Sequence, residues 1–300
     1  MSSLQPASDN FMHCQLFYVS ETQQAQFASL QTLIAQHQLP INLKPELFTD
    51  KLNQKRRQQL SQNATQPILV LDEKDKLSWL SDELSVAPEW DKLQRRVVSA
   101  GRKSELLLQA AKITADSTVI DATAGFGHDS LILASTGAQV IMLEEQPLMA
   151  LLLLAEQQRM RALPNWQKLM RRLQIFNTDA LSYFESMDFA DSSNGSTADS
   201  HQTIDVVYLD PMFPEDSYQD SKTGKGAKVG KHMQALHQLA RPPTLAEESQ
   251  LLQSAQAIVS QGTGQGRVVV KRPQLAPLLA HQQPSESWHN EAVRFDGYFV

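Results

Sequence analysis

The larger, C-terminal part of the chain is predicted to form an α/β fold on a mostly parallel sheet. From Thr118 onward, short apolar runs alternate with helical patterns, which is typical of strands joined by crossover helices. A glycine-bearing turn follows the first apolar run, and acidic residues follow the second. This order is typical of a Rossmann-like fold that binds a nucleoside at the carboxyl ends of its strands. Strands are expected near 118–121, 139–143, 173–177, 204–209 and 266–271, and helices near 129–136, 147–161, 180–187 and 243–260.

Residues 1–90 have a separate pattern, which predicts a small N-terminal α/β domain without recognisable chemistry. Strands are expected at 12–19, 67–71 and 76–80, a helix at 21–36 and an extended piece at 41–43. The segment Ala87–Asp91 is interpreted as a linker, so that the second domain covers 91–300. A helix over 101–112 is expected to lead into this domain, and segments 288–293 and 295–300 are expected to close it as an antiparallel hairpin. The polar stretch 188–202 is predicted to be a disordered insertion loop.

Composition excludes several classes of protein. The 300 residues carry a formal net charge of −6, which argues mildly against broad, non-specific nucleic-acid binding. The single cysteine, Cys14, lies in an apolar run and is expected in a core; it excludes an intrachain disulfide and any cysteine-cluster metal site. The longest apolar run, Leu148–Ala155, is too short to span a bilayer, and the N-terminus lacks the pattern of a signal peptide. We therefore expect a cytoplasmic protein that has no membrane partner and binds no metal.

The segment Ser117–Ser130 predicts a nucleoside-binding turn. It consists of a strand that ends at Asp121, a turn with Gly125 and Gly127, and the start of a helix. Glycine lets the backbone turn tightly and approach a ligand closely, and a helix N-terminus presents free N–H groups. The following strand ends in Glu144 and Glu145, where Rossmann-like folds bind the ribose hydroxyls.

The residues around the turn favour S-adenosylmethionine over NAD as the nucleoside cofactor. The dinucleotide pattern has a third glycine or alanine where this chain has Ser130. A pyrophosphate would be repelled by Asp129 at the helix entrance. A sulfonium with an amino-acid tail is cationic and tolerates nearby acids, and this turn carries Asp121, Asp129, Glu144 and Glu145.

The run Val206–Pro214, V-V-Y-L-D-P-M-F-P, indicates the reacting end of the site. Its apolar residues predict a buried strand that stops at Pro211, which cannot donate to a sheet ladder. Asp210 then lies at the carboxyl end of the strand and Phe213 on the following loop. A carboxylate, a backbone carbonyl and an aromatic face suit a planar ring with an exocyclic amine. The alternative is a solvated acid at an ordinary strand end.

Several motifs resemble one protein family in collinear order over about residues 95–300. They are Asp121–Asp129, Met142–Pro147, Val206–Pro214, Val268–Pro273 and the closing Arg294–Asp296. The family is the bacterial ribosomal RNA small subunit methyltransferase J family, guanine-N2 methyltransferases that use S-adenosylmethionine. The resemblance implies a seven-stranded class I methyltransferase fold and a small-subunit (16S) ribosomal RNA or ribosomal particle as partner. It also implies cofactor contacts at His128, Asp129, Glu144, Glu145, Asp179, Ala180 and Asp210.

Basic residues near the proposed reacting loop are candidates for RNA phosphate contacts. Lys222, Lys225, Lys228 and Lys231 follow the D-P-M-F-P run within a glycine-containing segment. Lys271 and Arg272 end a neighbouring strand, and we expect them to hold RNA phosphate as well. The alternative for both groups is an ordinary solvated surface.

The expected reaction is methylation of the N2 amine of guanine. Asp210 and the Pro211 carbonyl would accept hydrogen bonds from the amine, and Phe213 would stack on the flipped base. An adenine-N6 or protein-amine methyltransferase, a catalytically silent RNA-binding module of the same fold, and an NAD-dependent oxidoreductase remain alternatives.

Overall fold

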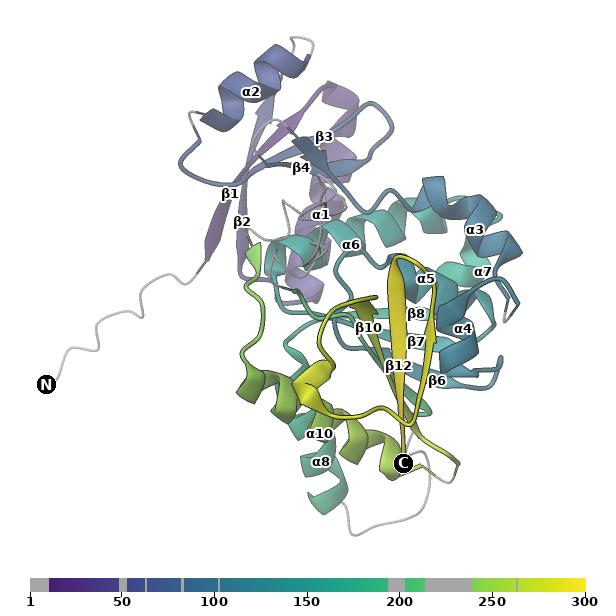
Figure 1. The fold of residues 1–300 in the computed structure, drawn as a ribbon. Coiled ribbons are helices and arrows are strands. Elements are labelled where there is room, and N and C mark those ends of the chain that lie inside the picture. The colour runs from purple at the N-terminus through teal and green to yellow at the C-terminus, as the bar shows by residue number, and fades with distance from the viewer. Residues whose placement is uncertain are drawn as a thin grey trace, which may run out of the picture. The chain divides into compact units, whose positions relative to one another are not determined.

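The structure is a computed structural model that describes residues 11–48, 53–62, 64–81, 84–101, 103–193, 203–213, 239–262 and 264–300. The contacts between residues divide the chain into two compact units, Met1–Ala87 and Pro88–Val300. Figure 1 shows the elements of both units. None of the helices in these ranges combines the length and apolar character that a bilayer-spanning segment requires.

The first unit is built on a five-stranded mixed sheet. Its strands are β1 (Met12–Tyr18), β2 (Ile41–Leu47), β3 (Ile68–Leu71), β4 (Leu77–Ser81) and β5 (Leu84–Val86), in the order β2-β1-β3-β4-β5. Strand β1 pairs in parallel with β2 and β3, whereas β4 is antiparallel to β3 and β5. The helices are η1 (Glu21–Gln23), α1 (Gln24–Gln36) and α2 (Gln54–Gln62). The predicted strands and first helix are confirmed, and Cys14 is fully buried.

Two differences from the sequence prediction concern weakly patterned segments. The extended piece at 41–43 is a full strand, Ile41–Leu47, and includes Pro45. Proline is tolerated there because β2 is an edge strand of the sheet. Helix α2 was missed because its polar sequence has only Leu60 to pack against the small core of Phe17 and its neighbours.

The second unit is built on the seven-stranded sheet that the resemblance implied. Its strands are β6 (Thr118–Asp121), β7 (Gln139–Glu144), β8 (Leu173–Asn177), β9 (Val206–Leu209), β10 (Arg267–Pro273), β11 (Glu286–His289) and β12 (Val293–Phe299). The order is β11-β12-β10-β9-β6-β7-β8. Strands β6 to β10 pair in parallel, and β12 is antiparallel to β10 and β11. The predicted terminal hairpin is thus confirmed at one edge of the sheet.

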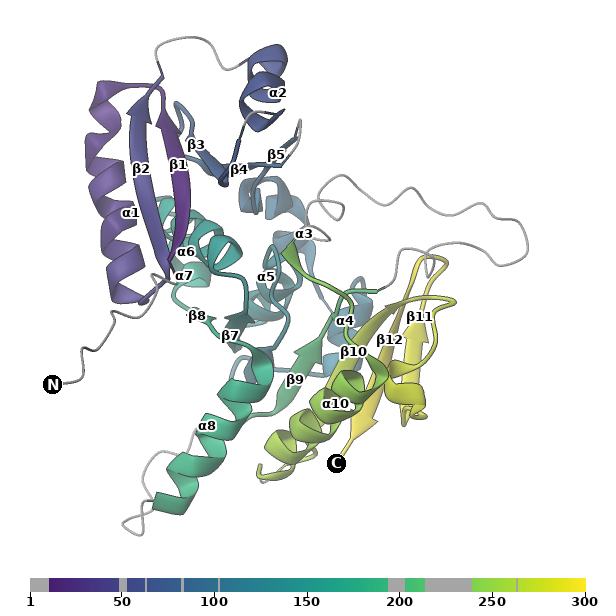
Figure 2. The same ribbon diagram turned by 90° about the vertical axis from the view of Figure 1, so that its left-hand side faces the viewer.

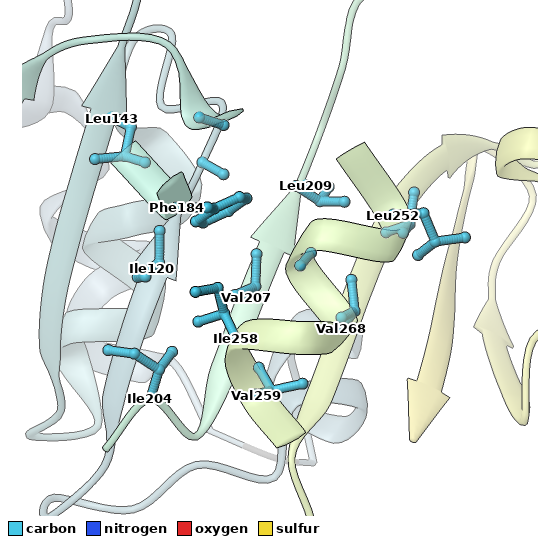
Figure 3. Close-up of a cluster of buried hydrophobic side chains, with 14 of the residues drawn as sticks. Ile120, Leu143, Phe184, Ile204, Val207, Leu209, Leu252, Ile258, Val259 and Val268 are labelled. Carbon is cyan, nitrogen blue, oxygen red and sulfur yellow. The ribbon is translucent and has the colours of Figure 1, made fainter. Parts of the chain in front are cut away.

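Helices cover both faces of this sheet. They are η2 (Trp90–Leu93), α3 (Gln94–Ser99), α4 (Leu106–Ala111), α5 (His128–Ser135), α6 (Pro147–Arg161), α7 (Gln167–Met170), α8 (Ala180–Ser193), α10 (Leu245–Ser260) and η4 (Leu279–His281). Helices α8 and α10 contact each other, while α4 and α5 pack together elsewhere on the sheet (Figure 2). The α8–α10 face buries a continuous apolar cluster that includes Ile120, Val207, Phe184 and Leu252 (Figure 3). This packing fixes the strand ends that carry the site.

Two predicted boundaries in this unit are wrong. The helix expected over 101–112 begins only at Leu106, because Gly101 and Ser104 form a turn before it. Helix α8 continues to Ser193, through six positions of the loop predicted at 188–202, whose remaining residues lie outside the described ranges. Extending an existing helix costs far less than starting one, so a polar sequence can prolong it.

Candidate active site

A cavity of about 700 Å³ lies at the carboxyl ends of β6, β7 and β9. Nearly all of the predicted cofactor and catalytic residues line it, although they come from segments far apart in the sequence. They are Asp121, Gly125, His128, Asp129, Glu144, Glu145, Asp179, Ala180, Asp210, Pro211 and Phe213, together with Lys271. The segment after the D-P-M-F-P run adds Arg241 and Leu251 to the wall.

The glycine turn between β6 and α5 is supported from behind by a tryptophan. Gly125 and Gly127 have φ values of 52° and 70°, in the left-handed region that favours glycine. A Cβ on Gly127 would lie 2.7 Å from the Met142 side chain and 3.0 Å from the Trp90 ring. The Trp90 indole donates a hydrogen bond of 2.7 Å to the carbonyl of Phe126. The close packing behind the turn therefore requires glycine at position 127, whereas Gly125 faces the cavity.

Asp121 is a buried acid at the end of β6. Its side chain is 1% exposed and accepts hydrogen bonds from the Ser130 hydroxyl and the Thr123 backbone N–H. Burial raises the pKa of Asp121 to about 7, and the nearby Asp129 and Asp210 add to this rise. Ser130, which breaks the dinucleotide pattern, thus serves to hold this carboxyl group.

Glu144 ends β7 and reaches back to the glycine turn. Its carboxylate accepts hydrogen bonds from the N–H groups of Gly125, at 3.0 Å, and Gln146, at 2.8 Å. Burial raises the pKa of Glu144 to about 7, although these backbone donors oppose the shift. Glu145, the alternative ribose ligand, is exposed at the cavity rim. Asn177 donates to the carbonyls of both glutamates and so fixes the chain at this corner.

Two further predicted cofactor residues have structural partners of their own. Asp179 caps helix α8 by accepting a hydrogen bond of 2.9 Å from the Ser182 N–H. Burial alone would raise the pKa of Asp179, but the hydrogen bonds from Ser182 outweigh it and lower the pKa. The His128 ring stacks on Phe126, and its Nε2 lies 2.6 Å from the Pro88 carbonyl oxygen.

A second group of acids in the cavity surrounds Lys271. The Lys271 ammonium donates to Asp129 at 2.7 Å and to Asp210 at 2.8 Å. The Tyr208 hydroxyl donates to the same Oδ2 atom of Asp129, also at 2.7 Å. Burial alone would raise the pKa of Asp129, but the Lys271 charge and these donors lower it below its usual value. Burial raises the pKa of Asp210, and Lys271 opposes the rise.

Lys271 and Arg272, which are predicted to hold RNA phosphate, both contact carboxylates of the protein. Lys271 points at two carboxylates inside the cavity. Arg272 is 4% exposed, donates to Glu248 at 2.8 Å, and lies over the Phe213 ring at 4.5 Å from its centroid. Arg272 is thus buried, whereas Lys271 lines the cavity. Lys222, Lys225, Lys228 and Lys231, as well as Pro214, lie outside the described residues.

Sequence reasoning missed the residues whose contribution depends on long-range contacts. Trp90, Asn177 and Tyr208 reach the site from the start of η2, the end of β8 and the middle of β9. Tyr208 stands within a run of buried apolar residues, where a hydroxyl needs a partner, and this was the available sequence signal. Trp90 and Asn177 gave no comparable signal.

The strand order, with a glycine turn after β6 and acids after β7, defines the class I methyltransferase fold. Residues 46–300 match the family model described as "Putative SAM-dependent methyltransferase". A crystal structure of a SAM-dependent methyltransferase from Neisseria gonorrhoeae has the same fold, with a TM-score of 0.62, 24% identity and 95% of both chains covered.

Relatives narrow the class to one family. The chain is 77% identical to ribosomal RNA small subunit methyltransferase J of Psychrobacter cryohalolentis, over 100% of both chains. It is 36% identical to the protein of the same name from Acinetobacter baumannii strain ACICU, over 74% of each chain. The protein therefore belongs to the ribosomal RNA small subunit methyltransferase J family of SAM-dependent methyltransferases.

Proposed function

We propose that the protein transfers a methyl group from S-adenosylmethionine to the exocyclic N2 amine of a guanosine in small-subunit (16S) ribosomal RNA. The observation that carries this proposal is the position of Asp210. Its carboxylate lines the same cavity as the acids Asp121 and Glu144, and Pro211 and Phe213 follow it on the wall. Relatives named for ribosomal RNA of the small subunit support the substrate class.

The cavity fits S-adenosylmethionine by the chemistry of its acids. Asp121 is buried and Glu144 is half-buried, and the hydrogen bonds to both carboxyl groups come from neutral hydroxyl and backbone donors. Such groups can accept hydrogen bonds from ribose hydroxyls and favour a cationic ligand. We assign Glu144 to the ribose, Asp121 to the cationic part of the ligand, and Asp179 and Ala180 to the base. When bound, S-adenosylmethionine supplies an electrophilic methyl group on its sulfonium.

Asp210 and Pro211 are proposed to hold the guanine amine. The lone pair of N2 is delocalised into the ring, so the free amine is a weak nucleophile. Acceptors on the amine hydrogens draw the nitrogen toward tetrahedral geometry and align it with the methyl group. The Asp210 carboxylate and the Pro211 carbonyl are such acceptors. Phe213 lines the cavity, but its side chain is 4% exposed and Arg272 lies over one face of the ring, so the proposed stacking requires the other face to become uncovered when the base enters.

The amine needs no strong base. Its proton becomes acidic only after the methyl group has arrived, and the nitrogen then carries positive charge. Asp210 is suited to accept this proton because burial raises its pKa. The base has to leave any helix in which it lies, since its amine could not otherwise reach a carboxylate inside a cavity.

Nucleoside analysis of methylated RNA tests this proposal. The purified protein and S-adenosylmethionine are incubated with small-subunit ribosomal RNA from a strain that lacks the gene, either as naked RNA or as the assembled particle. Mass spectrometry of the digested RNA should then show N2-methylguanosine. N6-methyladenosine instead would support an adenine methyltransferase. No methylated nucleoside from either substrate, with S-adenosylmethionine bound in calorimetry, would support a silent RNA-binding module.

The proposed RNA contact of the lysine-rich segment has its own test. Replacing Lys222, Lys225, Lys228 and Lys231 with glutamine should flatten the dependence of RNA affinity on salt. Each phosphate contact contributes about 0.7–0.9 to the slope of log affinity against log salt concentration, so the change should reach about three units. An unchanged slope would show that these lysines are a solvated surface.

A further inference from the structure

We propose that Lys271 is a positioning residue that holds the Asp210 carboxylate in its reactive orientation, and that Asp129 anchors Lys271. This assignment rests on the proposed function, because it gives Asp210 the role of amine acceptor. It replaces the expectation that Lys271 holds RNA phosphate. It also gives Asp129 a task other than direct contact with the cofactor.

The sheet register brings Lys271 next to Asp210. Strand β10 runs parallel to β9, with Val270 paired to Leu209, so the next residue of each strand reaches the same edge of the sheet. The Lys271 Nζ atom lies 2.8 Å from Oδ2 of Asp210. This bond fixes the rotation of the carboxylate about its Cβ–Cγ bond, and it thereby sets the direction in which Oδ1 can accept. The loop residue Asp210 is thus tied to a rigid central strand.

The Lys271 ammonium is held from its other side by Asp129. That carboxylate lies in the first turn of α5, and its Oδ2 accepts from both Lys271 and Tyr208, each at 2.7 Å. Arg96 of α3 adds weaker attraction, because it lies 3.9 Å from Asp129 and makes a bidentate pair with Glu105. Lys271, Asp129 and Asp210 have side chains that are 27%, 13% and 27% exposed. Their charges therefore interact with little solvent screening.

The charge balance shows what Lys271 does for Asp210. Two carboxylates share one ammonium, with Asp121 of β6 and Arg272 of β10 as the other charged groups nearby. Without the ammonium, burial and the repulsion between Asp129 and Asp210 would favour protonation of one of the two acids. A protonated Asp210 has a donor where the amine needs an acceptor. Lys271 thus sets both the orientation and the ionisation of the group.

The test compares variants of Lys271 in the full-length protein. Lys271→Met removes the charge and keeps the length of the side chain, and Lys271→Arg keeps the charge. The double variant Lys271→Met with Asp129→Asn removes one charge of each sign. The net charge of the cavity is then unchanged, so the double variant can be measured even if Lys271→Met alone folds poorly. Lys92→Met is the matched control, because Lys92 is an exposed lysine whose side chain is 67% accessible. For each protein the measurements are the melting temperature, the affinity for S-adenosylmethionine and the single-turnover methylation rate between pH 5.5 and 9.

We expect Lys271→Met to bind S-adenosylmethionine within about threefold of the parent and to methylate about 100-fold more slowly at pH 7, as misplacement of a reacting group by about 1 Å can cause. The acidic limb of its pH–rate profile should shift to higher pH by at least one unit, because the pKa of Asp210 rises. Lys271→Arg should recover part of the rate, and Lys92→Met should match the parent. The double variant should remain slow, since Asp210 still lacks its ammonium.

Two results would overturn the proposal. If the rate of Lys271→Met fell equally at every pH, Lys271 would be merely structural. If the double variant regained the parent rate, Lys271 would only neutralise Asp129. A crystal structure of Lys271→Met adds a test that needs no substrate: the Asp210 carboxylate should rotate, and an unchanged carboxylate would contradict the positioning role. Failure of the proposed function appears separately, as a parent protein that produces no N2-methylguanosine.

Discussion

The two groups of acids in the cavity are held in opposite ways. Asp121 and Glu144 receive hydrogen bonds from neutral donors, and burial raises both pKa values to about 7. Asp129 and Asp210 share the Lys271 ammonium, which lowers the pKa of Asp129 and limits the rise at Asp210. All four residues line the same cavity.

We propose that this difference corresponds to two tasks within one pocket. A buried carboxyl group without a protein cation gains most from a cationic or hydroxyl-bearing ligand, because the ligand supplies the missing compensation. A carboxylate that is already paired gains less from such a ligand, but its orientation is fixed in advance. The first group is therefore suited to binding the cofactor and the second to orienting the substrate amine.

The largest effect is expected from Asp210→Ala. Removing a preorganised acceptor should lower the methylation rate about 100- to 1000-fold. The affinity for S-adenosylmethionine should change little, because Asp210 is proposed to act on the substrate amine. Single-turnover rates and titration calorimetry measure the two quantities, with Asp116→Ala at an exposed position as the control. A loss of cofactor affinity as large as the loss of rate would contradict the division of the four acids into a cofactor-binding pair and a substrate-orienting pair.

Glu144→Ala should act on the cofactor. Hydrogen bonds to charged groups contribute about 1.5–3 kcal/mol, so the affinity for S-adenosylmethionine should fall about tenfold or more. Glu145→Ala is the matched control and should have a much smaller effect, because its side chain is exposed at the rim. If calorimetry gave the reverse order, the ribose contact would belong to Glu145.

Trp90→Phe tests whether cofactor binding by Asp121 and Glu144 depends on the glycine turn. The substitution keeps an aromatic ring and removes the hydrogen bond to the Phe126 carbonyl. The Gly125 N–H, which donates to Glu144, should then be less well placed. A net hydrogen bond contributes about 0.5–1.5 kcal/mol, so cofactor affinity should fall by about three- to tenfold. Trp288→Phe, on β11, controls for the loss of an indole and should leave the affinity unchanged.

A further prediction is a pH dependence of Asp121 and Glu144. The raised pKa values mean that the folded protein binds more protons than the unfolded chain between about pH 4.5 and 7, so its stability without cofactor should fall as the pH rises through this window. Cofactor affinity should rise over the same window, by at most about tenfold per pH unit for each proton released. Thermal melts and calorimetry of the parent and Glu144→Gln measure both effects. Equal slopes in the two proteins would show that Glu144 does not titrate there.

Much of the fold and part of the site could be predicted from the sequence by itself. The alternation of apolar runs and helical patterns determined the parallel strands, because a strand buried on both faces needs a continuous apolar run. The glycine turn and the acids after β6, β7 and β9 follow from local order along the chain, since parallel strands place their carboxyl ends at one edge. These features depend on neighbours in sequence, and the structure confirms the fold that they predict.

Only the tertiary structure decided which charged groups meet. Lys271 and Asp129 are far apart in sequence, as are Arg272 and Phe213 or Trp90 and Phe126, and nothing in the local pattern pairs them. A lysine at a strand end can face solvent, RNA or a buried acid with the same sequence around it. Burial and the register between β9 and β10 decide between these environments, because they set which opposite charge lies within hydrogen-bonding distance and how little water screens it.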